Sequence, residues 1–154
     1  MIALVLFDID GVLTDGYVYV GADGKETKRI SYDDIDAIFE LKRAGVKIGF
    51  LTGENSSFAE YVKNKFEPDF FVAGAKDKLS TFTGLETGAV LDPATVCFVG
   101  DSKKDLELLR HVGHSFVPSD VPDDIKESGF CVTRACRGNG VIREVAAIVL
   151  RHNS

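Results

Sequence analysis

The chain has 154 residues, 45% of them hydrophobic and 27% charged, with a formal net charge of −6. These values are typical of a soluble globular protein with a substantial core, and we expect residues 1–154 to form a single domain. The acidic balance argues against a nucleic-acid partner and against a polybasic membrane anchor, because both require clustered Lys and Arg side chains.

The apolar run Ile2–Phe7 predicts a buried strand rather than a signal peptide. No basic region precedes it, it is short for an export signal, and Asp8 and Asp10 interrupt it. No apolar stretch approaches the length needed to span a membrane. We therefore expect a cytoplasmic protein with no membrane contact.

Short apolar runs alternate with segments of helical periodicity along the chain. The runs are rich in Val, Ile and Phe and are almost continuously apolar, as in strands that are covered on both faces. They lie at residues 3–7, 46–51, 69–73, 95–99, 114–117 and 130–132. This alternation of strands and helices predicts an α/β fold with a parallel sheet.

One segment departs from this alternation. Tyr17–Val20 and Glu26–Ile30 flank the turn sequence Gly21-Ala22-Asp23-Gly24, so we predict a β-hairpin over about residues 17–30. It follows the first strand directly and should project near that strand's end. Because a two-stranded hairpin is marginally stable alone, we expect its Tyr and Val side chains to pack against another subunit.

Two carboxylates, Asp8 and Asp10, follow the first predicted strand and precede Gly11. In an open parallel sheet, ligands bind at the carboxyl ends of the strands. Carboxylates this close at the end of a buried strand repel each other unless a cation lies beside them. The alternative interpretation is a solvated acidic turn.

Later strand ends carry complementary groups. Thr52-Gly53 offers a hydroxyl and a backbone N–H to a phosphate oxygen, Lys78 opens a helix, and Asp101 is followed one helical turn later by Asp105. Each is ordinary by itself, as turn chemistry or as a charged helix start.

In chain order, Asp-x-Asp-Gly, Thr-Gly, Lys and Gly-Asp-x-x-x-Asp resemble the motifs of the haloacid dehalogenase superfamily, over nearly the whole chain. The resemblance implies a doubly wound, Rossmann-like sheet and phosphomonoester hydrolysis through an aspartyl-phosphate. It makes Asp8 the nucleophile and Asp10 the general acid and then the general base. It makes Thr52 and Lys78 the residues that hold the phosphoryl oxygens.

The same resemblance implies a Mg²⁺ cofactor. Its ligands would be the carboxylates of Asp8 and Asp101 and the backbone carbonyl of Asp10. Oxygen ligands beside a phosphate suit Mg²⁺, which retains several waters. The residues that would support this site are Asp105, Gly11 and Gly53.

The segments between the motifs leave no room for a cap domain. A capless chain with Asp-Gly-Val-Leu-Thr-Asp-Gly, a hairpin and the tail Arg137-Gly138-Asn139-Gly140 resembles the KDO 8-phosphate and KDN 9-phosphate phosphatases. That branch hydrolyses phosphorylated 2-keto-3-deoxy sugar acids as tetramers whose subunits share their sites. The resemblance therefore implies a phosphorylated sugar acid as substrate, a homotetramer, and contact of Arg137 with the acid.

At several positions the sequence differs from the pattern of these phosphatases, so the resemblance does not identify the sugar acid. Glu54 after Thr-Gly, with Lys65 eleven positions later, resembles the nine-carbon enzymes, and we predict both as substrate contacts. Ser102 replaces a second Asp that is common in the family, and Asn139 departs from the usual tail.

Two other functions compete with this interpretation. One is a catalytically weak tetramerisation module of sialic-acid or KDO metabolism, and the other is a phosphatase of another small phosphosugar. The complete set of catalytic groups favours an enzyme. We interpret the acidic residues Asp33, Asp34 and Asp36 as a helix N-terminus, and a position of Asp34 toward the mouth of the site stays open as an alternative.

Overall fold

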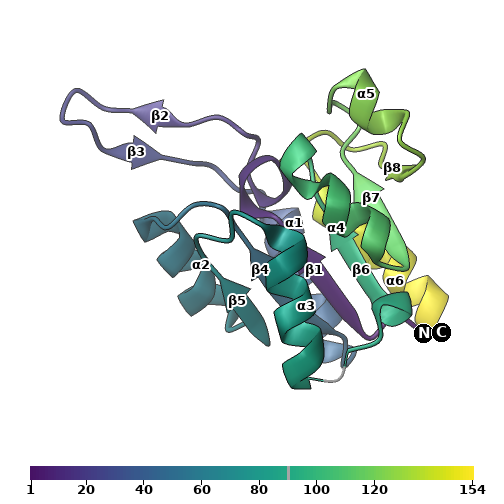
Figure 1. The fold of residues 1–154 in the computed structure, drawn as a ribbon. Helices are drawn as coiled ribbons and strands as arrows, with labels where there is room; N and C mark the ends of the chain where they lie inside the picture. The colour runs from purple at the N-terminus through teal and green to yellow at the C-terminus, as the bar shows by residue number, and fades with distance from the viewer. Residues whose placement is uncertain (90) are drawn as a thin grey trace.

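The computed structural model describes residues 1–89 and 91–154, and a six-stranded sheet runs through its centre (Figure 1). The strand order is β5-β4-β1-β6-β7-β8, and every neighbouring pair is parallel. The strands are β1 (Leu4–Phe7), β4 (Lys47–Leu51), β5 (Phe70–Val72), β6 (Val96–Val99), β7 (His114–Val117) and β8 (Cys131–Val132). All six predicted strands are confirmed, each to within one residue at either end.

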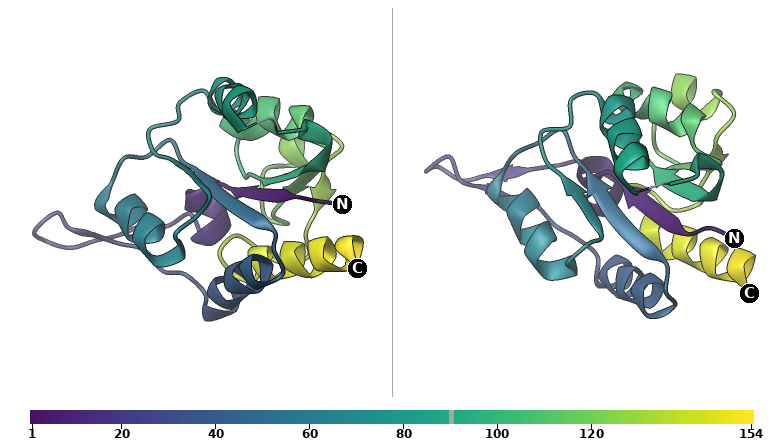
Figure 2. Two further views of the ribbon diagram at one scale, coloured as in Figure 1. Left: turned by 90° about the horizontal axis from the view of Figure 1, so that it is seen from below. Right: turned by 60° about the horizontal axis from the view of Figure 1, so that its bottom comes forward.

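Helices cover both faces of this sheet (Figure 2). One face packs against α1 (Tyr32–Arg43), α2 (Ser57–Phe66) and α6 (Val141–Asn153). The other packs against α3 (Lys78–Ala89), α4 (Leu106–His111) and α5 (Asp123–Lys126). Strand β1 shows why its sequence is continuously apolar: Val5 and Phe7 enter the first core, and Leu4 and Leu6 enter the second.

The chain order confirms the doubly wound topology. From β1 the chain builds outward through β4 and β5, then crosses to the other side of β1 and continues through β6, β7 and β8. Strand β1 therefore lies where the winding direction reverses. In such sheets the crevice at the carboxyl ends beside the reversal is the usual ligand site.

The predicted hairpin projects from the carboxyl edge of the sheet (Figure 1). Its paired strands are β2 (Tyr19–Val20) and β3 (Glu26–Thr27), which are antiparallel and shorter than the predicted runs. The turn is closed by a hydrogen bond of 2.9 Å from the Gly21 N–H to the Lys25 carbonyl. Four apolar side chains before the turn are exposed, namely Tyr17, Val18, Tyr19 and Val20. In the described part of the chain, the short helix η1 (Ile9–Leu13) and this hairpin lie between β1 and α1, and no cap domain does.

Asp34 joins the first helix to the last. Its fully buried carboxylate accepts hydrogen bonds from the N–H groups of Gly140 (3.1 Å), which caps the start of α6, and of Arg143 (2.9 Å) in the first turn of that helix. Asp33 and Asp34 lie in the first turn of α1, as predicted, and Asp36 lies just after it. The alternative, that Asp34 points toward the mouth of the site, is excluded, because amide groups at the start of α6 bind its carboxylate instead.

Replacing Asp34 with Ala is expected to lower the free energy of unfolding by about 1–3 kcal/mol, since two partly buried amide donors lose their acceptor. Urea denaturation measures this loss. The matched control is Asp36→Ala in the same helix, whose exposed side chain predicts a change within about 0.5 kcal/mol. Equal stability of the two variants would contradict the capping role.

The two ends of the described chain lie side by side (Figure 1). The side-chain amide of Asn153 accepts a hydrogen bond from the Ile2 N–H (2.7 Å) and donates one to the Ile2 carbonyl (2.8 Å). This pair fixes the end of α6 beside the start of β1. Among the described residues, no helix has the length and apolar character to cross a membrane.

Candidate active site

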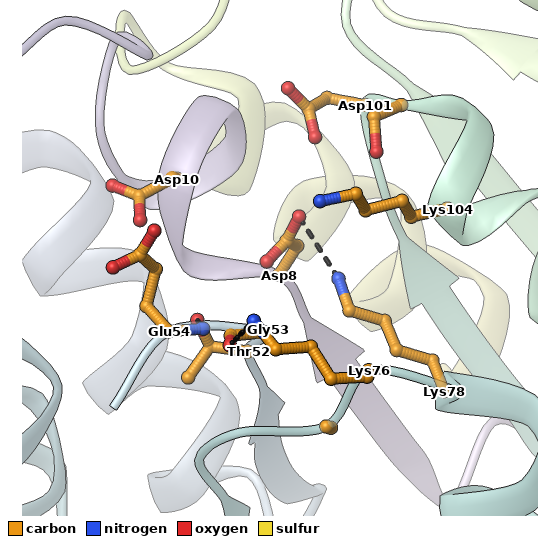
Figure 3. A pocket seen from close by; sticks show the side chains of 11 residues that line it. Asp8, Asp10, Thr52, Gly53, Glu54, Lys76, Lys78, Asp101 and Lys104 are labelled. Atoms are coloured by element: carbon orange, nitrogen blue, oxygen red, sulfur yellow. Dashed lines mark hydrogen bonds and ion pairs between the residues drawn. The ribbon is translucent and has the colours of Figure 1, made fainter. Parts of the chain in front are cut away.

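A cavity of about 430 Å³ opens at the carboxyl edge of the sheet, beside β1 (Figure 3). Its walls come from the loops that follow β1, β4, β5 and β6 and from the start of α3. The lining residues that the sequence had singled out are Asp8, Asp10, Thr52, Gly53, Glu54, Lys78, Asp101 and Ser102. Segments far apart in the chain thus meet around one space, as expected for parallel strands that end at a common edge.

Asp8 and Lys78 form the buried centre of the cavity. The Lys78 ammonium lies 3.1 Å from Asp8 Oδ2 and 2.6 Å from Asp105 Oδ1. Burial strongly raises the pKa of the Asp8 carboxyl, and the charge of Asp105 adds to this, against the opposing effect of Lys78. Burial acts to lower the pKa of Lys78, but the carboxylates of Asp8 and Asp105 outweigh it and raise that pKa. Lys78 is therefore a protonated ammonium group between two carboxyl groups.

Asp105 organises the loop after β6. Its Oδ2 atom accepts hydrogen bonds from the N–H groups of Asp101 (2.9 Å) and Ser102 (3.2 Å), and its side chain is fully buried. Burial, with the nearby charge of Asp105, raises the pKa of the Asp101 carboxyl to about 6. This pKa indicates that Asp101 lies where a cation would be stabilising.

Carboxylate oxygens of Asp8, Asp101 and Asp105 lie within 4.8 Å of one another, so these residues could hold a metal ion. The oxygens of Asp105 already accept hydrogen bonds from Lys78 and from two backbone amides. Asp8 also has partners, because its Oδ1 accepts from the Ile9 N–H at 2.8 Å and its Oδ2 pairs with Lys78. Asp8 and Asp101 line the cavity, however, and the fully buried Asp105 does not, so Asp8 and Asp101 are the better placed ligands, with Asp105 in support. An all-oxygen set of this kind fits a hard cation such as Mg²⁺.

Gly11 allows Asp101 to approach the first loop. Its φ is +83°, and a Cβ atom built on it would lie 1.9 Å from Asp101 Oδ2. Gly11→Ala is therefore expected to displace Asp101 and weaken Mg²⁺ binding about 10- to 100-fold, which isothermal titration measures. Gly24→Ala is the control, because Gly24 has a φ of +79° but no atom within 4 Å of its Cβ position. Unchanged Mg²⁺ affinity in Gly11→Ala would contradict this role.

Asp10 is held by a residue that the sequence motifs did not indicate. The ammonium of Lys28, which follows β3 of the hairpin, lies 2.8 Å from Asp10 Oδ1 and 3.0 Å from Oδ2. The Thr14 hydroxyl donates to Oδ1 as well, at 3.3 Å. Lys28 reaches Asp10 only because the hairpin folds back, and no spacing in the sequence predicts this contact.

Two further lysines line the cavity without having been predicted. Lys76 donates to the Gly53 carbonyl at 2.8 Å, and Lys104 extends into the cavity from the loop after β6 (Figure 3). The available signal in the sequence was their position, because Lys76 lies two residues before Lys78 and Lys104 lies between Asp101 and Asp105. Buried Thr52 and exposed Glu54 lie on the wall after β4, where the Thr52 hydroxyl accepts from the Glu54 N–H at 3.2 Å.

The remaining predicted substrate contacts differ in position. The Arg137 guanidinium lies 3.7 Å from Asp101 Oδ2 and 3.3 Å from Asp120 Oδ2, at the edge of the site. Lys65 does not line the cavity; it is exposed in the last turn of α2, with its ammonium 5.9 Å from the centre of the Tyr61 ring. A ten-residue helix is about 15 Å long, which carries Lys65 away from the edge where α2 begins.

Known proteins resemble this chain along almost all of its length. No protein-family model matches the sequence. The 3-deoxy-D-manno-octulosonate 8-phosphate phosphatase KdsC of Yersinia pestis is 29% identical over 149 residues, which cover 97% of this chain and 80% of that protein. The same enzyme from Moraxella catarrhalis, solved with magnesium, phosphate and KDO, has a TM-score of 0.91 at 26% identity, over 97% of this chain and 86% of that one.

A solved structure shares still more of the sequence. The probable YrbI family phosphatase of Pseudomonas syringae pv. phaseolica 1448a is 31% identical, with a TM-score of 0.93, over 97% of this chain and 85% of that one. A putative hydrolase of the HAD superfamily from Legionella pneumophila reaches a TM-score of 0.93 at 25% identity. The chain therefore belongs to the YrbI family of phosphatases, within the haloacid dehalogenase superfamily.

Proposed function

We propose that this phosphatase is a Mg²⁺-dependent phosphomonoesterase that acts on a 2-keto-3-deoxy sugar acid phosphate, of the KDO 8-phosphate or KDN 9-phosphate type, through an aspartyl-phosphate on Asp8. The observation that carries the proposal is the buried pairing of Asp8 with Lys78 inside the cavity, next to Asp101. This pairing places a nucleophile, a cation for the phosphoryl oxygens and a metal ligand around one point.

The reaction proceeds in two displacements. In the first, an Asp8 oxygen attacks phosphorus, the ester P–O bond breaks, and the proton of the Asp10 carboxyl passes to the leaving alkoxide. In the second, the Asp10 carboxylate takes a proton from water, the water oxygen attacks phosphorus, and the bond to Asp8 breaks to release phosphate. Lys78 and the Thr52 hydroxyl bind the phosphoryl oxygens during both displacements.

A metal would be held by the carboxylates of Asp8 and Asp101 and the backbone carbonyl of Asp10. When bound there, Mg²⁺ would neutralise charge between the carboxylates and the dianionic phosphate. The pKa of Asp101 near 6 supports this, because burial and the charge of Asp105 raise it and a bound cation would oppose both effects. Removal of Mg²⁺ by a chelator is expected to abolish turnover.

The substrate class rests on the relatives and on the wall after β4. The KdsC relatives are named for KDO 8-phosphate, and the Moraxella structure contains KDO itself. Glu54 lies on the cavity wall near Asp10, where its carboxylate would accept hydrogen bonds from sugar hydroxyls (Figure 3). Arg137 and Lys65 are the proposed contacts for the acid group.

We also propose that the hairpin joins subunits into a homotetramer with shared sites. The exposed Tyr and Val side chains at residues 17–20 support this, since contiguous apolar patches mark interaction surfaces. Such an assembly would let Lys65, which lies apart from its own chain's cavity, serve a site in a neighbour. Light scattering that finds a stable, fully active monomer would refute this assembly.

The decisive experiment is a steady-state screen of phosphate release with Mg²⁺. KDO 8-phosphate, KDN 9-phosphate and N-acetylneuraminate 9-phosphate are the test substrates, and the chelated enzyme is the control. We expect one sugar acid phosphate to exceed simple sugar phosphates in kcat/KM. If no phosphate ester is turned over while Mg²⁺ is bound, the chain is not a working phosphatase, and a structural module in an assembly becomes the better interpretation.

A further inference from the structure

We propose that Lys28 is a positioning residue that holds the Asp10 carboxylate for proton transfer, so that the hairpin takes part in catalysis. The inference rests on the proposed function, in which Asp10 is the general acid and base. It adds a residue from outside the superfamily motifs that acts through Asp10 and does not touch the phosphoryl group.

The contacts of Lys28 fix both oxygens of the Asp10 carboxylate. Its ammonium lies 2.8 Å from Oδ1 and 3.0 Å from Oδ2, and the Thr14 hydroxyl adds a third donor at 3.3 Å. Asp10 has a side chain that is 34% exposed at the cavity mouth, where it would otherwise be free to change rotamer. Proton transfer requires the carboxyl group within hydrogen-bond reach of the leaving oxygen, so its orientation matters.

Lys28 is itself held in place. Its side chain is only 9% exposed, which is rare for a lysine unless it is paired. Its ammonium lies 5.4 Å from the centre of the Phe58 ring, at the start of α2. The lysine is therefore enclosed between the hairpin, α2 and Asp10, and its position follows that of the hairpin.

The base of the hairpin is tied to the loop after β1 by further contacts. Thr14 and Ile30 form an isolated antiparallel bridge, and Arg29 Nε lies 2.6 Å from Asp15 Oδ2. The Arg29 pair is more open to solvent than the Lys28 pair, since the Arg29 side chain is 60% exposed. Two ion pairs thus cross the same stem, and only that of Lys28 reaches a residue of the cavity.

The two lysines, Lys78 and Lys28, have different roles in this arrangement. Lys78 pairs with Asp8, the proposed nucleophile, and lines the cavity. Lys28 pairs with Asp10 and is not among the residues that line the cavity. Loss of Lys28 should therefore affect the step that depends on Asp10 more than the binding of the phosphate group.

Two substrates whose leaving groups differ in their need for a proton can test whether Lys28 acts on the step that depends on Asp10. A sugar alkoxide needs the proton of Asp10 to leave, whereas 4-nitrophenolate leaves as an anion at neutral pH. In Lys28→Met we expect the single-turnover rate with the best sugar phosphate of the screen to fall about 10- to 100-fold, while the first-turnover burst of 4-nitrophenolate changes less than about threefold. Lys28→Arg should recover part of the lost rate, and KM should change little.

Arg29→Met is the matched control, because it removes the other ion pair of the stem and leaves Asp10 untouched. If Arg29→Met and Lys28→Met lower both rates equally, Lys28 only supports the hairpin and the inference is wrong. An unchanged or faster sugar phosphate reaction in Lys28→Met also overturns it. If the wild-type enzyme is active, the proposed function stands whether or not the Lys28 variants behave as expected. If the wild-type chain cleaves neither ester, both the proposed function and the role of Lys28 are wrong.

Discussion

Replacement of Asp8 by Asn is expected to lower the turnover of phosphate esters about 10⁴-fold or more, without loss of the fold. An amide cannot form the covalent bond to phosphorus, and removal of a nucleophile leaves only the binding and electrostatic contributions to catalysis. Phosphate release under saturating Mg²⁺ measures the effect. Asp23→Asn, the same change at the exposed hairpin turn, is the control and should keep full activity.

The same variant makes a second, separable prediction about stability. Burial raises the pKa of Asp8, so its folding contribution is complete below the unfolded-state pKa of about 3.9 and is lost as pH rises through the folded-state pKa. In metal-free protein at pH 7, Asp8→Asn should therefore be as stable as wild type or more stable. Its advantage should shrink toward pH 4. Urea denaturation that finds the variant less stable at pH 7 would show that the ionised carboxylate stabilises the fold.

Replacement of Lys78 by Met is expected to lower both stability and activity. The ammonium lies between the buried carboxylates of Asp8 and Asp105, at 3.1 and 2.6 Å, and its loss leaves both without that cation. Breaking a buried ion pair from one side costs about 3–5 kcal/mol. Loss of a cation that binds the phosphoryl oxygens should reduce kcat about 10²- to 10³-fold.

Lys76→Met is the matched control for that variant. Lys76 is two positions earlier, exposed, and bonded to the Gly53 carbonyl, so its loss should cost about 0.5–1.5 kcal/mol. Urea denaturation of the metal-free proteins, together with kcat in Mg²⁺, compares the two variants. If Lys78→Met is as stable as Lys76→Met, Lys78 does not stabilise the buried charges of Asp8 and Asp105, contrary to what the short distances indicate.

The sheet and much of the cavity could be predicted from the sequence because one geometric rule connects them. Parallel strands end at a common edge, so residues that follow β1, β4 and β6 must meet there whatever their distance along the chain. This rule alone predicts that the side chains of Asp8, Thr52 and Asp101 lie close together. Lys78 joined them because α3 begins at the same edge.

Residues whose position depends on tertiary packing could not be predicted in this way. Lys28 meets Asp10 only after the hairpin folds back, and Asp34 meets α6 only where two helices pack. The place of Lys65 could not be predicted either, because a spacing counted along the chain does not give the direction in which α2 runs, and its contact with a substrate stays a prediction. Side-chain direction and the packing of separate elements are not encoded in local patterns.

The central place of β1 has a consequence for synthesis on the ribosome. The strand emerges before both of its neighbours in the sheet, because Leu4 pairs with Lys47 on one side and with Val96 on the other, and Asn153 fixes its start. At about 5–20 residues per second, the second partner follows the first strand by roughly 5–20 seconds. A nascent chain stalled before residue 96 would keep one edge of this apolar strand unpaired. We expect such chains to be the form of this phosphatase most prone to aggregate or to engage chaperones.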